Sequence, residues 1–152
     1  QPQYVARFES ITNTTTDGSN LGRFDVWTSS INMFKDHPVT GVGIGQWRTI
    51  YEASYRLPTE NQHLYHAHNN FIQLLGEVGL LGLLGVLIFY GSIIVDNFVV
   101  WFKKRDPYSL CAMIAVICYV FVFGQVEYTL DNSSGMRIMY FMLATMLQLR
   151  DN

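Results

Sequence analysis

Residues 78–95, VGLLGLLGVLIFYGSIIV, decide the fold class because these 18 positions carry no charge and are mostly apolar. At a helical rise of about 1.5 Å per residue, a helix over this run is roughly 27 Å long, close to the hydrocarbon thickness of a bilayer. The run therefore predicts a helix that spans a membrane.

Two more apolar runs follow. Residues 108–126, YSLCAMIAVICYVFVFGQV, are 19 uncharged positions, enough for a second crossing. Residues 138–149 number only 12, a length more typical of a core or interfacial helix. We expect an all-α integral membrane protein with two or three transmembrane helices, at about 78–98, 108–126 and 136–149, plus an extracytoplasmic loop that contains short amphipathic helices.

The composition agrees with this class. Apolar residues make up 49% of the chain and charged residues only 14%, against roughly 25% in soluble domains. The formal net charge of −2 offers no basic patch, so we expect no nucleic-acid partner and a membrane-lipid environment instead. The chain opens at Gln1 without a signal region, and we expect it to be part of a larger membrane protein.

Orientation follows from the short basic loop at residues 101–107, WFKKRDP, between the first two spans. By the positive-inside rule this loop belongs in the cytoplasm. Residues 1–70 would then form the extracytoplasmic loop, and residues 71–152 the transmembrane part.

Two helices are predicted in the outer half. In residues 21–36 a stripe of apolar residues recurs at helical spacing and ends before Pro38; its members are Phe24, Trp27, Ile31 and Phe34. A second helix should begin near Asn69 or Asn70, where Asn70 and Gln73 resemble a capping box. Glycines recur every third residue from Gly76 to Gly85, and we favour close helix packing over a helix break as their role.

Three of the four histidines, His63, His66 and His68, fall within six positions just before the first span. A metal site is one hypothesis, but the second ligand pair of a recognisable zinc motif is missing, and we expect the imidazoles of His66 and His68 to point to opposite sides. A polar surface loop is the other simple interpretation. We predict no metal.

A sharper hypothesis comes from the position of His68 directly before a helix start. Unpaired backbone N–H groups and the positive end of the helix dipole favour an anion such as phosphate there. A neutral imidazole beside it could take a proton from an alcohol. This combination suits transfer from a phosphate-activated donor to a hydroxyl.

Three motifs in order resemble the bacterial O-antigen ligase and O-antigen polymerase family. His68-Asn69, nine residues, then Gly79-x-x-Gly82 is similar to its His-Asn-x9-Gly-x-x-Gly signature. Upstream, Arg23-x-x-x-Trp27 and residues 37–45, HPVTGVGIG, resemble the segments that precede it, and residues 126–130, VEYTL, resemble the family's end. The resemblance covers about residues 21–149.

The resemblance implies a multi-pass glycosyltransferase of the bacterial inner membrane, which moves a glycan from a polyprenyl diphosphate carrier to a hydroxyl of a glycan or lipid-glycan acceptor. It implies His68 as the base, Arg23 as the cation that holds the diphosphate, and Asn69 as a supporting residue. His66 is a second candidate base, and Arg48 a further anion contact. No cofactor is expected.

Other interpretations remain open on the sequence. A non-catalytic transporter or flippase module for lipid-linked glycans would need the same Arg and His residues. Arg23 could simply cover Trp27 with its aliphatic stem. For Glu77 we expect a locally paired carboxylate without a catalytic role.

Overall fold

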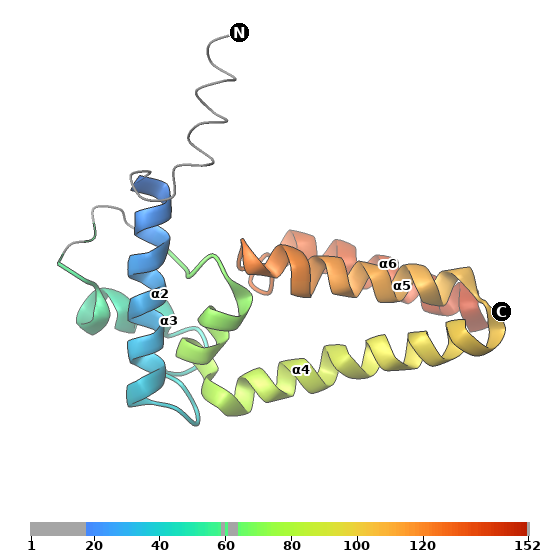
Figure 1. Cartoon of the computed structure of the whole chain (residues 1–152), viewed down its shortest axis with the longest axis horizontal. Coiled ribbons are helices and arrows are strands. Elements are labelled where there is room, and N and C mark those ends of the chain that lie inside the picture. Colours follow the sequence, from blue (N-terminus) through green and yellow to red (C-terminus); the bar gives the residue numbers. More distant parts are fainter. Residues whose placement is uncertain (1–17, 59, 61–63, 152) are drawn as a thin grey trace, which may run out of the picture.

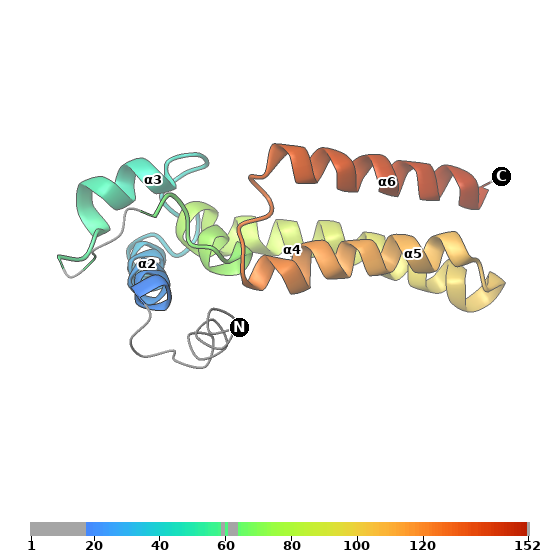
Figure 2. The same ribbon diagram turned by 90° about the horizontal axis from the view of Figure 1, so that it is seen from above.

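The computed structural model describes residues 18–58, 60 and 64–151, and all regular elements within them are helical. Helices α4 (Asn70–Lys104), α5 (Pro107–Val116) and α6 (Ser133–Asp151) run along one common direction. Helix α2 (Gly18–Asp36) lies across the end of this bundle at which α4 begins (Figure 1). Figure 2 shows the same arrangement from above. The predicted all-α membrane fold is confirmed.

Within the described residues, two helical segments are long and apolar enough to cross a membrane: Asn70–Lys104 and Pro107–Gln125. They contain the predicted spans at 78–98 and most of 108–126. In the second, α5 continues as a π-helix, η2 (Ile117–Val122), and a 3-10 turn, η3 (Phe123–Gln125). Only 11% and 28% of their most apolar windows are buried, so these apolar faces are open to lipid or to further helices. Full crossing by residues 136–149 stays a prediction.

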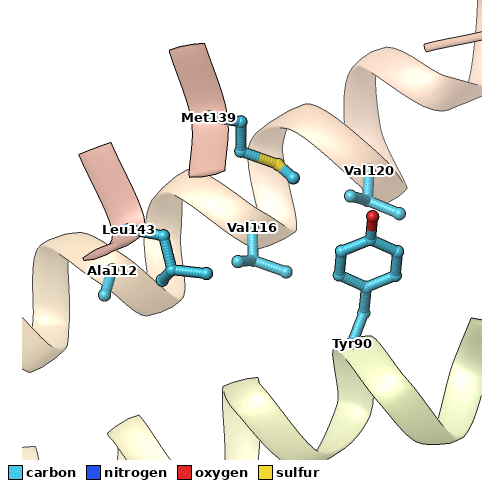
Figure 3. Packing of buried hydrophobic residues seen from close by; sticks show 6 residues of the cluster. All are labelled: Tyr90, Ala112, Val116, Val120, Met139 and Leu143. Atoms are coloured by element: carbon cyan, nitrogen blue, oxygen red, sulfur yellow. The ribbon is translucent and has the colours of Figure 1, made fainter. Parts of the chain in front are cut away.

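A small apolar core joins the three bundle helices, with α5 between α4 and α6. Figure 3 shows how it is built from one large ring and smaller aliphatic side chains. The fully or nearly buried members are Tyr90 of α4, Ala112, Val116 and Val120 from the α5 segment, and Met139 and Leu143 of α6. At the end of the second span, η3 contacts α4.

The basic loop lies at the opposite end of the bundle from α2 (Figure 1). It is a tight turn in which Arg105 adopts a left-handed conformation, with φ of 57°, and Asp106 caps α5 by accepting a hydrogen bond from Ser109 N at 2.6 Å. The two ends of the bundle are therefore chemically different, one basic and one rich in histidine.

Gly79 corrects our interpretation of the glycine series. It adopts φ of 64° and ψ of −162° and interrupts the helical backbone of α4, so it is a helix break. The freed amides of Leu80 and Leu81 donate to the carbonyls of Pro38 and Val39, at 2.9 and 3.1 Å. A Cβ at Gly79 would collide with the backbone of this loop.

The other glycines of the series differ among themselves. Gly76 does serve close packing, because a Cβ there would lie 3.2 Å from Ser30 O and 3.3 Å from the Trp47 ring. A Cβ at Gly85 would have no atom within 4 Å among the described residues. The spacing of three therefore has no single role.

The predicted apolar stripe of α2 is also wrong. The helix does end before Pro38, but the side chain of Phe24 is 52% exposed, and the buried face comprises Val26, Ser29, Ser30 and Met33. Small residues occupy this face because α2 approaches α4 closely at Gly76. The hydroxyl of Ser29 donates a hydrogen bond to Tyr55 O, and that of Ser30 donates to Val26 O. These bonds offset the free-energy cost of burying the two polar groups.

Candidate active site at the start of helix α4

Asn69 caps α4. Its side-chain oxygen accepts hydrogen bonds from Phe71 N at 2.9 Å and Ile72 N at 3.1 Å, while its amide group donates to Gln125 O at 3.1 Å. The cap is therefore Asn69 and not the Asn70–Gln73 pair. Two of the amides that we expected to be unpaired for an anion are used by this cap.

Asn70 ties the start of α4 to the end of the second span. Its side chain is fully buried; its amide donates to Val120 O at 3.0 Å and Thr129 Oγ1 at 2.8 Å, and its oxygen accepts from Thr129 N at 2.8 Å. These bonds hold residues 127–129 against residues 66–70. From the sequence we expected the side chain of Asn70 to cap a helix, and we did not expect it to link α4 to residues 120–129.

Two histidines meet on one carboxylate in this region. Glu127 lies 3.1 Å from His68 Nδ1 through Oε2 and 3.4 Å from His66 Nε2 through Oε1. The two imidazole centroids are 4.1 Å apart. The expectation that the rings point to opposite sides is wrong, because the backbone bends at both histidines and the two rings reach the same carboxylate. His63 lies outside the described residues.

The backbone between the histidines is tightly held. Ala67 is fully buried, its N–H donates to Gln73 Oε1 at 2.8 Å, and its carbonyl accepts from Trp27 Nε1 at 2.6 Å. His68 has φ of 48°, a left-handed conformation that non-glycine residues adopt rarely. Such outliers are often found at functional sites.

The electrostatics of the cluster favour a neutral His66 and an ionised Glu127. Burial, and then the neighbouring His68, lower the pKa of His66. Burial alone would raise the pKa of Glu127, but its hydrogen bonds with His68 and Tyr128 N, together with both imidazoles, give a net lowering. At neutral pH a carboxylate therefore faces two imidazoles.

A pocket of about 250 Å³ lies beside this cluster. His66 is part of its wall, whereas His68 is not one of the residues that line it. Polar and aromatic side chains dominate the lining, among them Arg48, Tyr65, His66, Glu77, Tyr128 and Asp131. A mixed wall of this kind suits a ligand with several hydroxyl groups.

Glu77 is a buried residue of the pocket wall. It is paired locally, as we expected from the sequence. It is 8% exposed and accepts hydrogen bonds from Gly45 N at 2.6 Å and Gln73 Nε2 at 3.0 Å. Tyr128 donates to it at 3.4 Å, and burial followed by the Glu77 charge raises the pKa of Tyr128. These bonds join the loop that contains Gly45, helix α4 and the segment that follows the second span into one wall.

The two predicted arginines are placed differently. Arg48 lines the pocket, pairs with Glu52 at 3.0 Å, and holds its guanidinium 4.2 Å from the centre of the Tyr65 ring. Arg23 is partly exposed on α2 and makes no hydrogen bond or ion pair with any other described residue. The structure thus brings Arg48 to the site and leaves Arg23 on the neighbouring helix.

The cluster could in part hold a metal ion, since His66, His68 and Glu127 offer ligand atoms within 4.8 Å of one another. However, His66 Nδ1 accepts a hydrogen bond from His68 N at 3.3 Å. The proton of a neutral His66 then sits on Nε2, the atom that faces Glu127, and no lone pair remains there for a metal. These residues fit a metal only after His66 gives up this bond.

Glu127, Tyr128 and Asp131 are the site residues that the sequence interpretation missed. They lie about 60 positions after the histidines, so no local pattern joins the two segments. One signal was present: an acidic residue directly after an apolar span is costly near a membrane and often functional.

Comparison of the sequence with known proteins identifies the family to which the chain belongs. The sequence model of the O-antigen ligase family matches residues 2–87. The exopolysaccharide production protein ExoQ of Rhizobium meliloti (strain 1021) is 27% identical over 136 residues, which cover 82% of this chain. The chain spans about 30% of the length of that relative. With more than half of its length matched by the family model, the chain belongs to the O-antigen ligase family.

Proposed function

We propose that this chain carries part of the active site of a membrane glycosyltransferase, which moves a glycan from a polyprenyl diphosphate carrier to a hydroxyl of a glycan or lipid-glycan acceptor. The observation that carries the proposal is the pair of imidazoles on Glu127, beside a polar pocket and at the end of two apolar helices. Membership of the O-antigen ligase family supports the reaction class.

The site faces the outside of the bacterial inner membrane in this proposal. Lys103 and Lys104 end α4 at the far end of the bundle, where the positive-inside rule assigns the cytoplasm. Helix α2 and the histidine segment then lie at the outer membrane surface, where a lipid-linked glycan and its acceptor can meet.

The proposed base is His68. It takes the proton of the acceptor hydroxyl while the oxygen attacks the anomeric carbon and the diphosphate leaves. His66, in the pocket wall, contacts the acceptor, and Asn69 supports the site by capping α4. A single displacement inverts the anomeric centre, and Glu127 is not available as a nucleophile because it is shared by two imidazoles.

Arginine chemistry supports the donor side. A guanidinium stays charged at any working pH and can hold two phosphate oxygens at once. Arg48, whose side chain is 56% exposed at the pocket wall, and Arg23 on α2 are the proposed contacts of the diphosphate, which lies outside the pocket. No step of this mechanism requires a metal.

The acceptor side of the proposal rests on the size of the pocket. Its volume of about 250 Å³ is below the range of roughly 300–1,000 Å³ that drug-sized ligands occupy. One sugar residue is therefore the expected occupant, with its hydroxyl groups on Asp131 and Tyr65.

The test uses the full-length protein, purified and incubated with a lipid-linked glycan and a glycan acceptor. Released polyprenyl diphosphate together with an extended acceptor supports the transferase. Tight binding of the lipid-linked glycan without release would refute it and favour a transporter or flippase module. Arg48→Ala and Arg23→Ala should both raise KM for the donor, and Lys35→Ala, an exposed cation at the end of α2, serves as the control.

A further inference from the structure

Glu127 is the one carboxylate in the described part of the chain that touches two imidazoles. Its side chain is 34% exposed, and Tyr128 N donates to its Oε1 at 3.1 Å. The carboxylate is therefore held by the backbone N–H of Tyr128 and by the two imidazole rings. A surface glutamate that forms only one exposed ion pair would not be held by both a backbone N–H and two rings.

The contacts of His68 assign its proton. A carboxylate only accepts hydrogen bonds, so the 3.1 Å contact between Glu127 Oε2 and His68 Nδ1 places the proton on Nδ1. In a neutral imidazole the other nitrogen then keeps the lone pair. Nε2 of His68 makes no hydrogen bond or ion pair with the residues that the structure describes.

His66 is arranged in the opposite way. Its Nδ1 accepts from His68 N at 3.3 Å, and its Nε2 faces Glu127 Oε1 at 3.4 Å. Both ring nitrogens are engaged, so His66 offers no free lone pair. Of the two candidate bases, the geometry singles out His68.

We propose that Glu127 is the positioning residue of the transfer reaction, which holds His68 with Nδ1–H toward the carboxylate and thereby keeps the lone pair of Nε2 free to take the proton of the acceptor hydroxyl. This inference rests on the proposed transferase function. As the hydroxyl oxygen bonds to the anomeric carbon, the O–H proton passes to Nε2. The electron pair of the broken carbon–oxygen bond leaves with the diphosphate.

The carboxylate also balances the charge of that step. When Nε2 takes the proton, the imidazole becomes a cation whose Nδ1–H still points at Glu127. The other ionisable groups around the pair are His66 on the same carboxylate and Asp131, whose charge acts on His66. His68 also has a left-handed backbone, an outlier of the kind that clusters at active sites.

The decisive variant is Glu127→Gln in the full-length protein. An amide can donate to Nδ1 and thereby select the wrong tautomer, with the proton on Nε2. A comparable change in a serine protease triad lowers kcat about 10⁴-fold. We expect kcat to fall about 10²- to 10⁴-fold, with KM for donor and acceptor changed less than about threefold.

Glu127→Asp keeps the charge and the acceptor, so it should recover at least about a tenth of the wild-type kcat. Asp96→Asn is the matched control, because Asp96 pairs with Arg150 at the far end of the bundle. It should leave kcat unchanged, which shows that loss of a carboxylate as such is harmless. Equal melting temperatures for Glu127→Gln and wild type separate positioning from folding.

Three outcomes would overturn the proposal. If Glu127→Gln keeps the wild-type kcat while His68→Ala is inactive, positioning by Glu127 is wrong and the transferase function stands. If His68→Ala is fully active, His68 is not the base and Glu127 does not act through it, whereas the proposed function itself fails only if the wild type binds the lipid-linked glycan and releases no polyprenyl diphosphate. If chelation abolishes wild-type activity and Glu127→Gln loses a bound metal, Glu127 is a metal ligand instead.

Discussion

Replacing Asn70 with alanine should disconnect the two halves of the site. Asn70 makes three hydrogen bonds, to Val120 O, to Thr129 Oγ1 and from Thr129 N, at 2.8 to 3.0 Å. At about 1 kcal/mol of net stability for each bond, the loss is about 3 kcal/mol. The cost rises further because Thr129 N would stay buried without its partner, the side-chain oxygen of Asn70.

The same substitution should also lower activity, because residues 127–129 are held against the histidines through this amide. We expect a lower melting temperature of the purified full-length protein and a kcat reduced at least about tenfold, since displacement of Glu127 by about 1 Å misplaces the base. Both quantities are measured on the same preparation, by a thermal melt and by release of polyprenyl diphosphate.

Asn97 provides the matched control on the same helix. It is also buried, but its amide donates only to Ile93 O at 2.8 Å, and its Oδ1 has no partner among the described atoms. Asn97→Ala should cost less than about 1 kcal/mol and leave kcat unchanged. If Asn70→Ala melts and turns over like Asn97→Ala, the link between Asn70 and the site is wrong.

Three further predictions concern the backbone, pH and metal. Gly79→Ala should lower the free energy of unfolding by more than about 2 kcal/mol, because φ of 64° and the adjacent loop backbone both exclude a Cβ. Gly85→Ala should leave stability unchanged, and thermal melts of both variants test this. Burial and His68 hold the pKa of His66 below its ordinary 6.5, so the folded state binds that proton less tightly and stability falls as the pH drops below about 6.5. His66→Gln should therefore lose less stability than wild type between about pH 7 and pH 5, and an equal loss would contradict this. Treatment of the full-length protein with a chelator should leave transfer activity unchanged, and a loss that zinc restores would contradict a metal-free mechanism.

The parts of the fold that the sequence predicts are those set by local composition. The runs at 78–95 and 108–126 are helical over most of their length because lipid offers no partner to a backbone polar group. Pro38 ends α2 for an equally local reason. The position of His68 just before α4 also follows from the Asn-rich helix start.

The errors arise where distant segments meet. Gly79 can break α4 because the loop at residues 38–43 accepts hydrogen bonds from the freed N–H groups of Leu80 and Leu81. The spacing of the glycines does not predict that contact. Phe24 lies outside and Ser30 inside because α2 approaches α4 at a glycine, which reverses the usual order of burial.

The candidate site divides in the same way. His66, His68 and Arg48 could be singled out from residue type and position. Glu127 could not, because it reaches the histidines only through the fold of the second span and the buried amide of Asn70.

The central claim is that His68 is the proton acceptor of the transfer. Its most direct test is the single-turnover release of polyprenyl diphosphate by full-length protein carrying His68→Ala, with His66→Ala and the exposed His37→Ala in parallel. We expect a loss of at least about 10²-fold for His68→Ala, a smaller loss for His66→Ala and none for His37→Ala. Wild-type turnover by His68→Ala would contradict it, and a loss confined to His66→Ala would move the role to that residue.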